Sequence, residues 1–123
     1  MKVAVVSDDF RSLSGVVEKA RRFLLFEAKR GERPRLEKYF ELPSNCPAYH
    51  DLLREEASFH PIDGMVVIAN QAHADCLDLL ERRGTHVHLT SEPDPHTAVA
   101  LWLDEKLPPN PPVRLSREVP LGP

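Results

Sequence analysis

Hydrophobic residues follow two patterns along this 123-residue chain, and each pattern predicts a different secondary structure. Short apolar runs are typical of strands buried on both faces, whereas one-sided stripes at a spacing of three and four residues are typical of helices. The runs predict strands at residues 2–7, 22–28, 35–42, 65–69 and 85–90. The stripes predict helices at residues 47–60, 72–83 and 95–107. The predicted order is therefore strand, hairpin, helix, strand, helix, strand, helix.

The second and third strands are predicted to form a hairpin, because Gly31 and Pro34 mark a turn between them. Alternation along the third strand places one set of side chains on a common face, namely Leu36, Lys38, Phe40 and Leu42. The opposite face is expected to carry Glu37, Tyr39 and Glu41. This half-polar pattern predicts a strand at the edge of a sheet.

Residues with a known preference for helix starts or helix ends mark the boundaries of the predicted helices. Pro47 suits a first helical position, and Pro61 disfavours helix in the residue before it. Gly84 is a stop signal for the second helix, while Asp94 and Pro95 suit the N-cap and first residue of the third. The expected core-facing residues of the last two helices are Ala72, Cys76, Leu79, Leu80, Ala98, Leu101 and Trp102.

This order of elements predicts an α/β fold with a three-layer, five-stranded mixed sheet. Parallel neighbours need helical crossovers of one hand, so the expected strand order is 3-2-1-4-5 with helices on both faces. The connections then change direction between the first and fourth strands. Open sheets bind ligands beyond the carboxyl ends of their strands at such a point. The candidate binding residues at these ends are Ser7, Asp8, Asp9, Asn70, Gln71 and Ser91.

The charge of the chain argues against binding to nucleic acid or to an anionic membrane. Sixteen Lys and Arg against nineteen Asp and Glu give a net charge of −3, whereas both partners need a basic field. The stretch from Glu18 to Lys38 is an exception, because it holds eight basic residues against four Glu. Two interpretations of this stretch are open: the solvated face of a hairpin, or a patch that faces an anion.

The sequence predicts one cytoplasmic domain followed by a tail. Cys46 and Cys76 lie far apart and form neither a disulfide framework nor a zinc-finger spacing. No signal-peptide pattern and no apolar run near the ~20 residues of a membrane span are recognisable. The strand and helix patterns occupy residues 1–107. Residues 108–123 hold six of the twelve prolines and are expected to be extended or disordered, with no packing of their own. Contact of this tail with the domain or with a neighbour is left open.

Several separated segments resemble a known family in the order in which they occur. They are MKVAVVSDDF, KARRFLLFE, YHDLLRE, HPIDGMVVIAN and RRGTHVHLTSEPDPHTAV. Together, over about residues 1–107, they are similar to the dinitrogenase iron-molybdenum cofactor biosynthesis family of the NifX and NafY type. The resemblance implies a ribonuclease-H-like fold and a non-enzymatic protein that binds or carries an iron-sulfur or iron-molybdenum cofactor precursor. It also implies nitrogenase cofactor assembly proteins as partners.

The resemblance also implies ligands for such a cluster. His50 and His60 match histidines of relatives, and Cys46 stands four residues before His50, a spacing that places two side chains on one helical face. Imidazole and thiolate suit iron. Alternatives are open for each residue: His50 as a solvated side chain, Cys46 as a loop thiol, and His60 as a turn residue before proline.

Two segments depart from the family pattern. After the fourth strand many relatives are glycine-rich, whereas this chain has Asn70-Gln71-Ala72-His73-Ala74-Asp75. The other segment precedes the second strand. Relatives carry His-(Ala/Phe)-Gly-Lys/Arg before ARRF, and the His is the suspected cluster ligand. This chain has Val16-Val17-Glu18-Lys19 there, which retains only Lys19 as a candidate cofactor-binding residue. Valine cannot ligate a metal, and Glu18 replaces a glycine that would let the backbone approach a bulky group. An alternative function follows: a family member that has lost its ligand and acts as a protein-interaction or regulatory module.

Two further pairs of residues have spacings compatible with metal binding. His73 and Cys76 lie three apart on a predicted helix, but Cys76 belongs to the apolar stripe and is interpreted as core. His86 and His88 share one face of a predicted strand. On an edge strand, exposure of both imidazoles to solvent is the favoured interpretation.

A nuclease was also considered, because Asp8, Asp9 and Asp63 are the kind of carboxylates that hold two divalent ions in ribonuclease-H-like enzymes. Asp63 precedes its strand, however, whereas Asp8 and Asp9 follow theirs, so the topology separates them. No Ser/His/Asp triad and no glycine-rich phosphate loop is recognisable. The sequence therefore favours a binding protein over an enzyme.

Overall fold

The computed structural model describes residues 1–44 and 61–112. Five strands form one mixed sheet in the order β3-β2-β1-β4-β5, as predicted. The strands are β1 (Lys2–Val6), β2 (Arg22–Glu27), β3 (Arg35–Glu41), β4 (Val66–Ala69) and β5 (His86–Leu89). The helices are a 3₁₀ turn η1 (Val17–Lys19), α2 (Ala74–Arg82) and α3 (Pro95–Leu103). The helix predicted at residues 47–60 lies outside the described residues.

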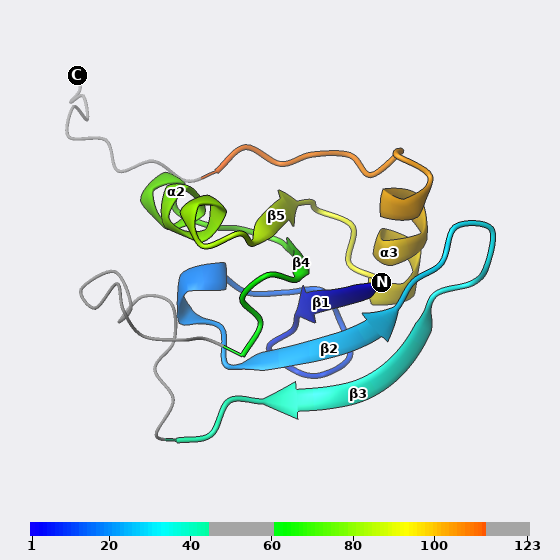
Figure 1. The fold of residues 1–123 in the computed structure, drawn as a ribbon, viewed down its shortest axis with the longest axis horizontal. Coiled ribbons are helices and arrows are strands. Elements are labelled where there is room, and N and C mark those ends of the chain that lie inside the picture. The colour runs from blue at the N-terminus through cyan, green and yellow to red at the C-terminus, as the bar shows by residue number, and fades with distance from the viewer. Residues whose placement is uncertain (45–60, 113–123) are drawn as a thin grey trace.

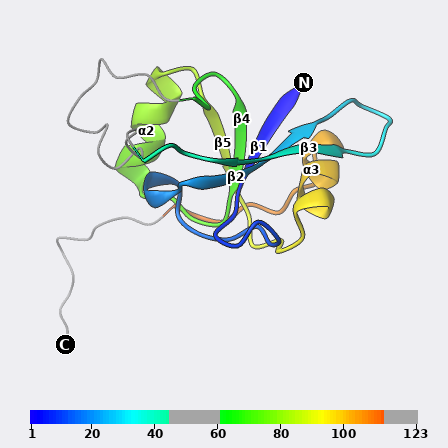
Figure 2. The same ribbon diagram turned by 90° about the horizontal axis from the view of Figure 1, so that it is seen from below.

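The sheet is the middle of three layers, with α2 on one face and α3 on the other (Figure 1, Figure 2). β1 is antiparallel to β2 and parallel to β4, and β4 is parallel to β5. Two hydrophobic clusters fill the spaces between the layers. The cluster on the α2 side includes Ala4, Val6, Phe23, Val67, Cys76 and Leu80. The cluster on the α3 side includes Val3, Val5, Phe26, Ile68, Ala98 and Val99.

Strand β1 explains why the chain needs both layers. Val3 and Val5 pack on the α3 side, whereas Ala4 and Val6 pack on the α2 side, and all four are fully buried. Burying a Val side chain contributes about 1.5–3 kcal/mol relative to leaving it exposed. An unbroken apolar run is therefore favourable only in a central strand covered on both faces.

The prediction that Leu36 and Phe40 lie on the same face of the edge strand β3 is wrong. The pairing of β2 with β3 shifts register, because Leu25 faces Lys38 whereas Phe26 faces Leu36. Glu37 is thus the extra residue of a β-bulge, and a single extra residue moves the following side chains to the other face. Leu36 therefore packs with the α3-side cluster, while Phe40 packs with the α2-side cluster.

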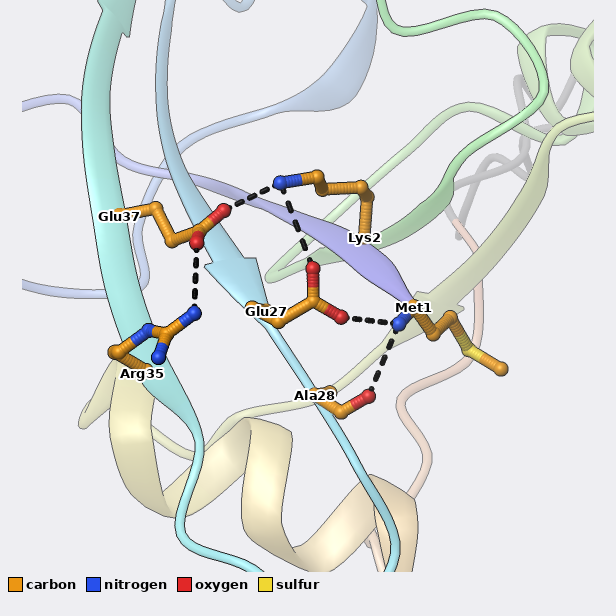
Figure 3. A network of polar contacts seen from close by, with 6 residues as sticks. All are labelled: Met1, Lys2, Glu27, Ala28, Arg35 and Glu37. Atoms are coloured by element: carbon orange, nitrogen blue, oxygen red, sulfur yellow. Dashed lines mark hydrogen bonds and ion pairs between the residues drawn. The ribbon is translucent and has the colours of Figure 1, made fainter.

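The side chain of the bulged residue Glu37 is held by ion pairs (Figure 3). Lys2 of β1 reaches across β2 to contact Glu37, and Arg35 Nη2 lies 3.0 Å from the other carboxylate oxygen. The Lys2 hydrogen bond, followed by that from Arg35, lowers the pKa of Glu37. Lys2 also lies 3.5 Å from Glu27, whose carboxylate contacts the ammonium group of Met1. The group of charges therefore links three strands at one end of the sheet.

Helix α3 starts as predicted and ends earlier. Asp94 is its N-cap and accepts a hydrogen bond from the Thr97 N–H at 2.9 Å. The helix was expected to reach residue 107 but ends at Leu103, because Glu105 takes a left-handed conformation with φ +58°. The Lys106 N–H then bonds the Leu101 carbonyl at 2.8 Å, which closes the helix end. Ala98 and Trp102 face the core as predicted, whereas Val99 is fully buried in place of the expected Leu101.

The beginning of the proline-rich segment lies along the edge strand β5. The Asn110 N–H donates to the Leu89 carbonyl at 2.8 Å. The Asn110 side-chain amide donates to the Asn70 carbonyl at 3.1 Å. Residues 108–112 form neither helix nor strand, and Asn110 has specific contacts with the domain.

Candidate functional site

The candidate site is the carboxyl rim, the end of the sheet where β1, β4 and β5 all terminate. These three strands are parallel, so Ser7, Asn70 and Thr90 emerge at the same end, as the sequence predicted. The Thr90 N–H donates to the Ala69 carbonyl at 2.9 Å. The Asn70 side-chain amide donates to the Thr90 carbonyl at 3.1 Å. Asn70 is thus used to join the ends of β4 and β5.

Asp9 organises the loop that follows β1. Its Oδ1 accepts hydrogen bonds from the backbone N–H groups of Ser12 at 2.8 Å and Arg11 at 2.9 Å. The hydroxyl of the buried Ser7 donates to the same oxygen at 3.2 Å. These bonds, the one from the Ser12 N–H first, lower the pKa of Asp9 from 3.8 to about 2. Ser7 and Asp9 therefore stabilise the loop through contacts with each other and with its backbone.

Asp8 is held against the same loop through its backbone. Its N–H donates to Ser14 Oγ at 3.0 Å, and its carbonyl accepts from Arg22 Nη1 at 2.9 Å. The Asp8 carboxylate lies over Gly15, where a Cβ atom would be only 2.4 Å from Oδ1. Gly15 also has φ +94°, so two features of this position require glycine.

The Val16-Val17 segment joins the loops that follow β1 and β4. Val16 forms a parallel bridge with Gln71. The Val17 N–H donates to the Gln71 carbonyl at 3.0 Å, and the Gln71 N–H donates to the Gly15 carbonyl at 3.4 Å. The Val17 side chain is fully buried in the α2-side cluster. The two valines thus occupy this part of the rim with packing and backbone pairing.

Glu18 occupies the N-terminus of α2. Its two carboxylate oxygens accept hydrogen bonds from the His73 N–H at 3.1 and 3.2 Å. His73 is the N-cap of α2, and its Nδ1 accepts from the Asp75 N–H at 3.1 Å. The exposed N–H groups and the dipole of a helix favour a negative group at this position. In this chain the negative group is the protein's own carboxylate.

Cys76 is a core residue, as its place in the apolar stripe predicted. It is fully buried, and burial, followed by the negative charge of Glu18, raises the pKa of its thiol to about 12. The thiol is therefore protonated at neutral pH. Beside it, His73 Nε2 is buried and has no hydrogen-bond partner in the described part of the chain.

The other predicted residues of the rim are exposed or lie beyond the described ranges. Lys19 and Ser91 are exposed to solvent, as is Gln71. Cys46, His50 and His60 fall outside residues 1–44 and 61–112, so their role as metal ligands stays a prediction. Within those ranges, no group of three or more His, Cys, Asp and Glu side chains is arranged to hold a metal ion.

Asp63 is engaged at the opposite end of the sheet. Its carboxylate forms two contacts with the Arg83 guanidinium, at 3.1 Å to Nε and 2.6 Å to Nη2. Both side chains are largely buried, with 14% and 12% exposed. Asp63 precedes β4, whereas Asp8 and Asp9 follow the parallel strand β1, so the three carboxylates do not converge.

His86 and His88 are exposed on β5, an edge strand, as expected. The His88 ring lies 5.9 Å from the Trp102 ring, measured between centroids. Burial, followed by the proximity of His86, lowers the pKa of His88 below 6.5. Both imidazoles line a hollow of about 390 Å³ beside the edge of the sheet.

Two contributions to this end of the molecule were missed in the sequence. The hydrogen bond from His73 to Glu18 was not predicted, because the two residues lie 55 positions apart in the chain. Contact of the tail with the domain was left open, but the bonds from Asn110 to Leu89 and Asn70 were not predicted. Neither contact has a local sequence signal, because both join segments far apart in the chain.

Comparisons with known proteins give a similarity of fold. No protein-family model and no curated protein matches the chain. The crystal structure of PH0822 superposes with a TM-score of 0.64 at 14% identity, covering 89% of this chain and 96% of PH0822. A "putative dinitrogenase" (mj0327) from Methanocaldococcus jannaschii superposes with a TM-score of 0.56 at 13% identity, covering 89% and 94%. The chain therefore has the five-stranded α/β fold of these two proteins along most of its length.

Within the described ranges, no helix is long and apolar enough to cross a membrane.

Proposed function

We propose that this protein is a non-enzymatic accessory protein of nitrogenase cofactor biosynthesis, which binds or carries an iron-sulfur or iron-molybdenum cluster in the cytoplasm. The observation that carries the proposal is the similarity of fold to the "putative dinitrogenase" of M. jannaschii, which extends over 89% of this chain. The cluster is cargo in this proposal, so the protein has to hold it and release it to assembly proteins.

The chemistry of the proposed ligands fits such cargo. Cys46, His50 and His60 supply thiolate and imidazole, which bind iron in proteins. Lys19 is exposed beside the carboxyl rim and would supply positive charge for an anionic cluster. The described residues of the rim do not supply these soft ligands, so binding depends on the segment between Asn45 and Pro61.

A second candidate function is a protein-interaction or regulatory module that no longer holds a cluster. One observation favours it: the rim between β1 and β4 is closed by groups of the chain itself. Glu18 accepts the His73 N–H at the start of α2, and Val16 pairs with Gln71. A bulky cluster at this part of the rim would have to displace both contacts.

Metal analysis after anaerobic production distinguishes the two functions. The protein would be purified from cells that make nitrogenase cofactor precursors, and its iron and molybdenum measured together with its absorption spectrum. We expect a coloured, iron-containing protein that loses metal in the His50→Ala and His60→Ala variants. The matched control is His96→Ala, because His96 is exposed and its ring packs on Phe26, on the α3 side of the sheet.

Each outcome has a distinct meaning. A colourless, iron-free protein would exclude the carrier function and leave the interaction module. Full metal content in both histidine variants would refute the assignment of these two ligands. Equal loss in the His96→Ala control would show that the loss is not specific to the proposed ligands.

A further inference from the structure

The edge strand β5 presents two imidazoles on the same face. Successive side chains of a strand point to opposite faces. His86 and His88 are therefore on the side of α3, where His88 lies beside Trp102, whereas Val87 packs with the α2-side cluster. β4 is the neighbour of β5 in the sheet, and β5 has no second strand beside it in the described part of the chain.

The two imidazoles also share one hollow. This hollow of about 390 Å³ is lined by His86 and His88 together with Val66, Thr85 and Trp102, among other residues. Two residues apart on a strand corresponds to about 6.6 Å along the backbone, which is close enough for two imidazole nitrogens to approach one ion. Neither imidazole makes a hydrogen bond or an ion pair with any other described residue, so the ring nitrogens are not used by contacts within the described part of the chain.

We propose that His86 and His88 form a two-imidazole site for a divalent first-row transition metal ion. Imidazole nitrogen suits copper, nickel and zinc, and the affinity of such sites rises along the series to copper. Glu81 of α2 also lines the hollow, but among the described residues no three His, Cys, Asp or Glu side chains are arranged to hold one metal ion. Water molecules would complete the coordination, so the site would be open and the ion exchangeable.

This site uses other residues than the one in the proposed function. His86 and His88 lie on the outer strand at the α3 side of the sheet, whereas the proposed cluster ligands are Cys46, His50 and His60. The inference therefore stands or fails independently of cluster binding. It would also explain why two imidazoles of β5 and the chain's single tryptophan, which belongs to α3, line one hollow.

Trp102 is a built-in reporter for this site. It is the only tryptophan of the chain, and its ring lies 5.9 Å from that of His88. The experiment is a titration of the full-length, metal-free protein with Ni²⁺, an ion that quenches nearby fluorophores without oxidising thiols. We expect saturable quenching at one equivalent, reversal by a chelator, and displacement of Ni²⁺ by Zn²⁺ with recovery of fluorescence.

Variants locate the bound ion. His86→Ala and His88→Ala should each weaken Ni²⁺ binding at least about tenfold, since each removes one of two protein ligands, while circular dichroism confirms that they fold. The control His96→Ala should bind as the parent protein does. Absent or non-saturable quenching, or unchanged affinity in both β5 variants, would overturn the inference. Loss of binding in a His50→Ala/His60→Ala double variant with intact β5 histidines would place the ion elsewhere and would also overturn it.

Discussion

Replacing Glu18 by alanine is expected to destabilise the protein, because it removes the acceptor from the N-terminus of α2. In the folded protein the Glu18 carboxylate accepts the His73 N–H with both oxygens, at 3.1 and 3.2 Å. This contact joins η1 to α2 across 55 residues of sequence. The variant should therefore weaken the packing between the loop after β1 and the helix.

The magnitude follows from the two parts of the contact. A hydrogen bond to a charged group contributes about 1.5–3 kcal/mol to stability. A negative charge at a helix N-terminus adds about 0.3–1 kcal/mol. Glu18 is only half-buried, so the lower end of these ranges applies, and we expect Glu18→Ala to cost about 1–2 kcal/mol. Glu18→Gln keeps an acceptor oxygen and loses the charge, so its cost should be about 0.5–1 kcal/mol.

Urea unfolding at neutral pH measures both effects. With a slope of about 1–3 kcal/mol/M, the alanine variant should lower the midpoint by about 0.3–2 M without a change of slope. Glu81→Ala is the matched control, since Glu81 is an exposed residue of α2, and changes at such positions usually stay within about 0.5 kcal/mol. A Glu18→Ala cost no larger than that of Glu81→Ala would refute the capping role. Equal costs for Glu18→Gln and Glu18→Ala would show that charge, and not the hydrogen bond, stabilises the helix.

Three further predictions concern the loop after β1 and the core. Gly15→Ala should lower the free energy of unfolding, measured in urea, by about 1–2 kcal/mol. Adding Asp8→Ala to this variant should restore only part of that loss, because the clash with Oδ1 disappears while φ +94° remains. In a Cys46→Ser background, Cys76 should react with a thiol reagent only as fast as the protein unfolds, since the thiol is buried and its pKa is about 12; rapid reaction of the folded protein would contradict its burial. The pKa of Asp9 is lowered from 3.8 to about 2, so its contribution to stability is complete above about pH 4 and is lost as the pH falls towards 2. Asp9→Asn should remove this part of the acid dependence, and an unchanged acid limb in unfolding experiments would contradict the hydrogen-bonded loop.

The sequence predicted those elements in which the pattern of apolar residues indicates which side chains are buried. β1 is an unbroken apolar run because Val3 and Val5 face one helix layer while Ala4 and Val6 face the other. The positions of Ser7 and Asn70 at one rim followed from strand order alone. Burial and topology are thus encoded locally, which explains why the five-stranded order could be predicted.

The features that were missed depend on contacts or conformations without a local pattern. The β-bulge at Glu37 leaves the alternation of β3 unmarked, and its side chain is held by Lys2, 35 residues away. The end of α3 depends on Glu105 in a left-handed conformation, which sequence reasoning assigns to glycine or asparagine. Asp9 stays a candidate binding residue, but the hydrogen bonds that it accepts from the backbone of its own loop were not predicted. In each case the observed conformation depends on backbone geometry or on tertiary contacts, neither of which the local sequence pattern indicates.

Val16 and Glu18, which differ from the residues of the similar family at these positions, have different structural roles. Val16 contributes to the rim through its backbone bridge with Gln71, and a backbone bridge does not depend on the side chain at that position. Glu18 acts through its carboxylate, which occupies the N-terminus of α2 and would compete with any other anion there. Access of an anion to this part of the rim therefore depends on Glu18 more than on Val16. The acidic side chain makes the protein its own ligand at the start of α2, and another anion at that position would have to displace the Glu18 carboxylate.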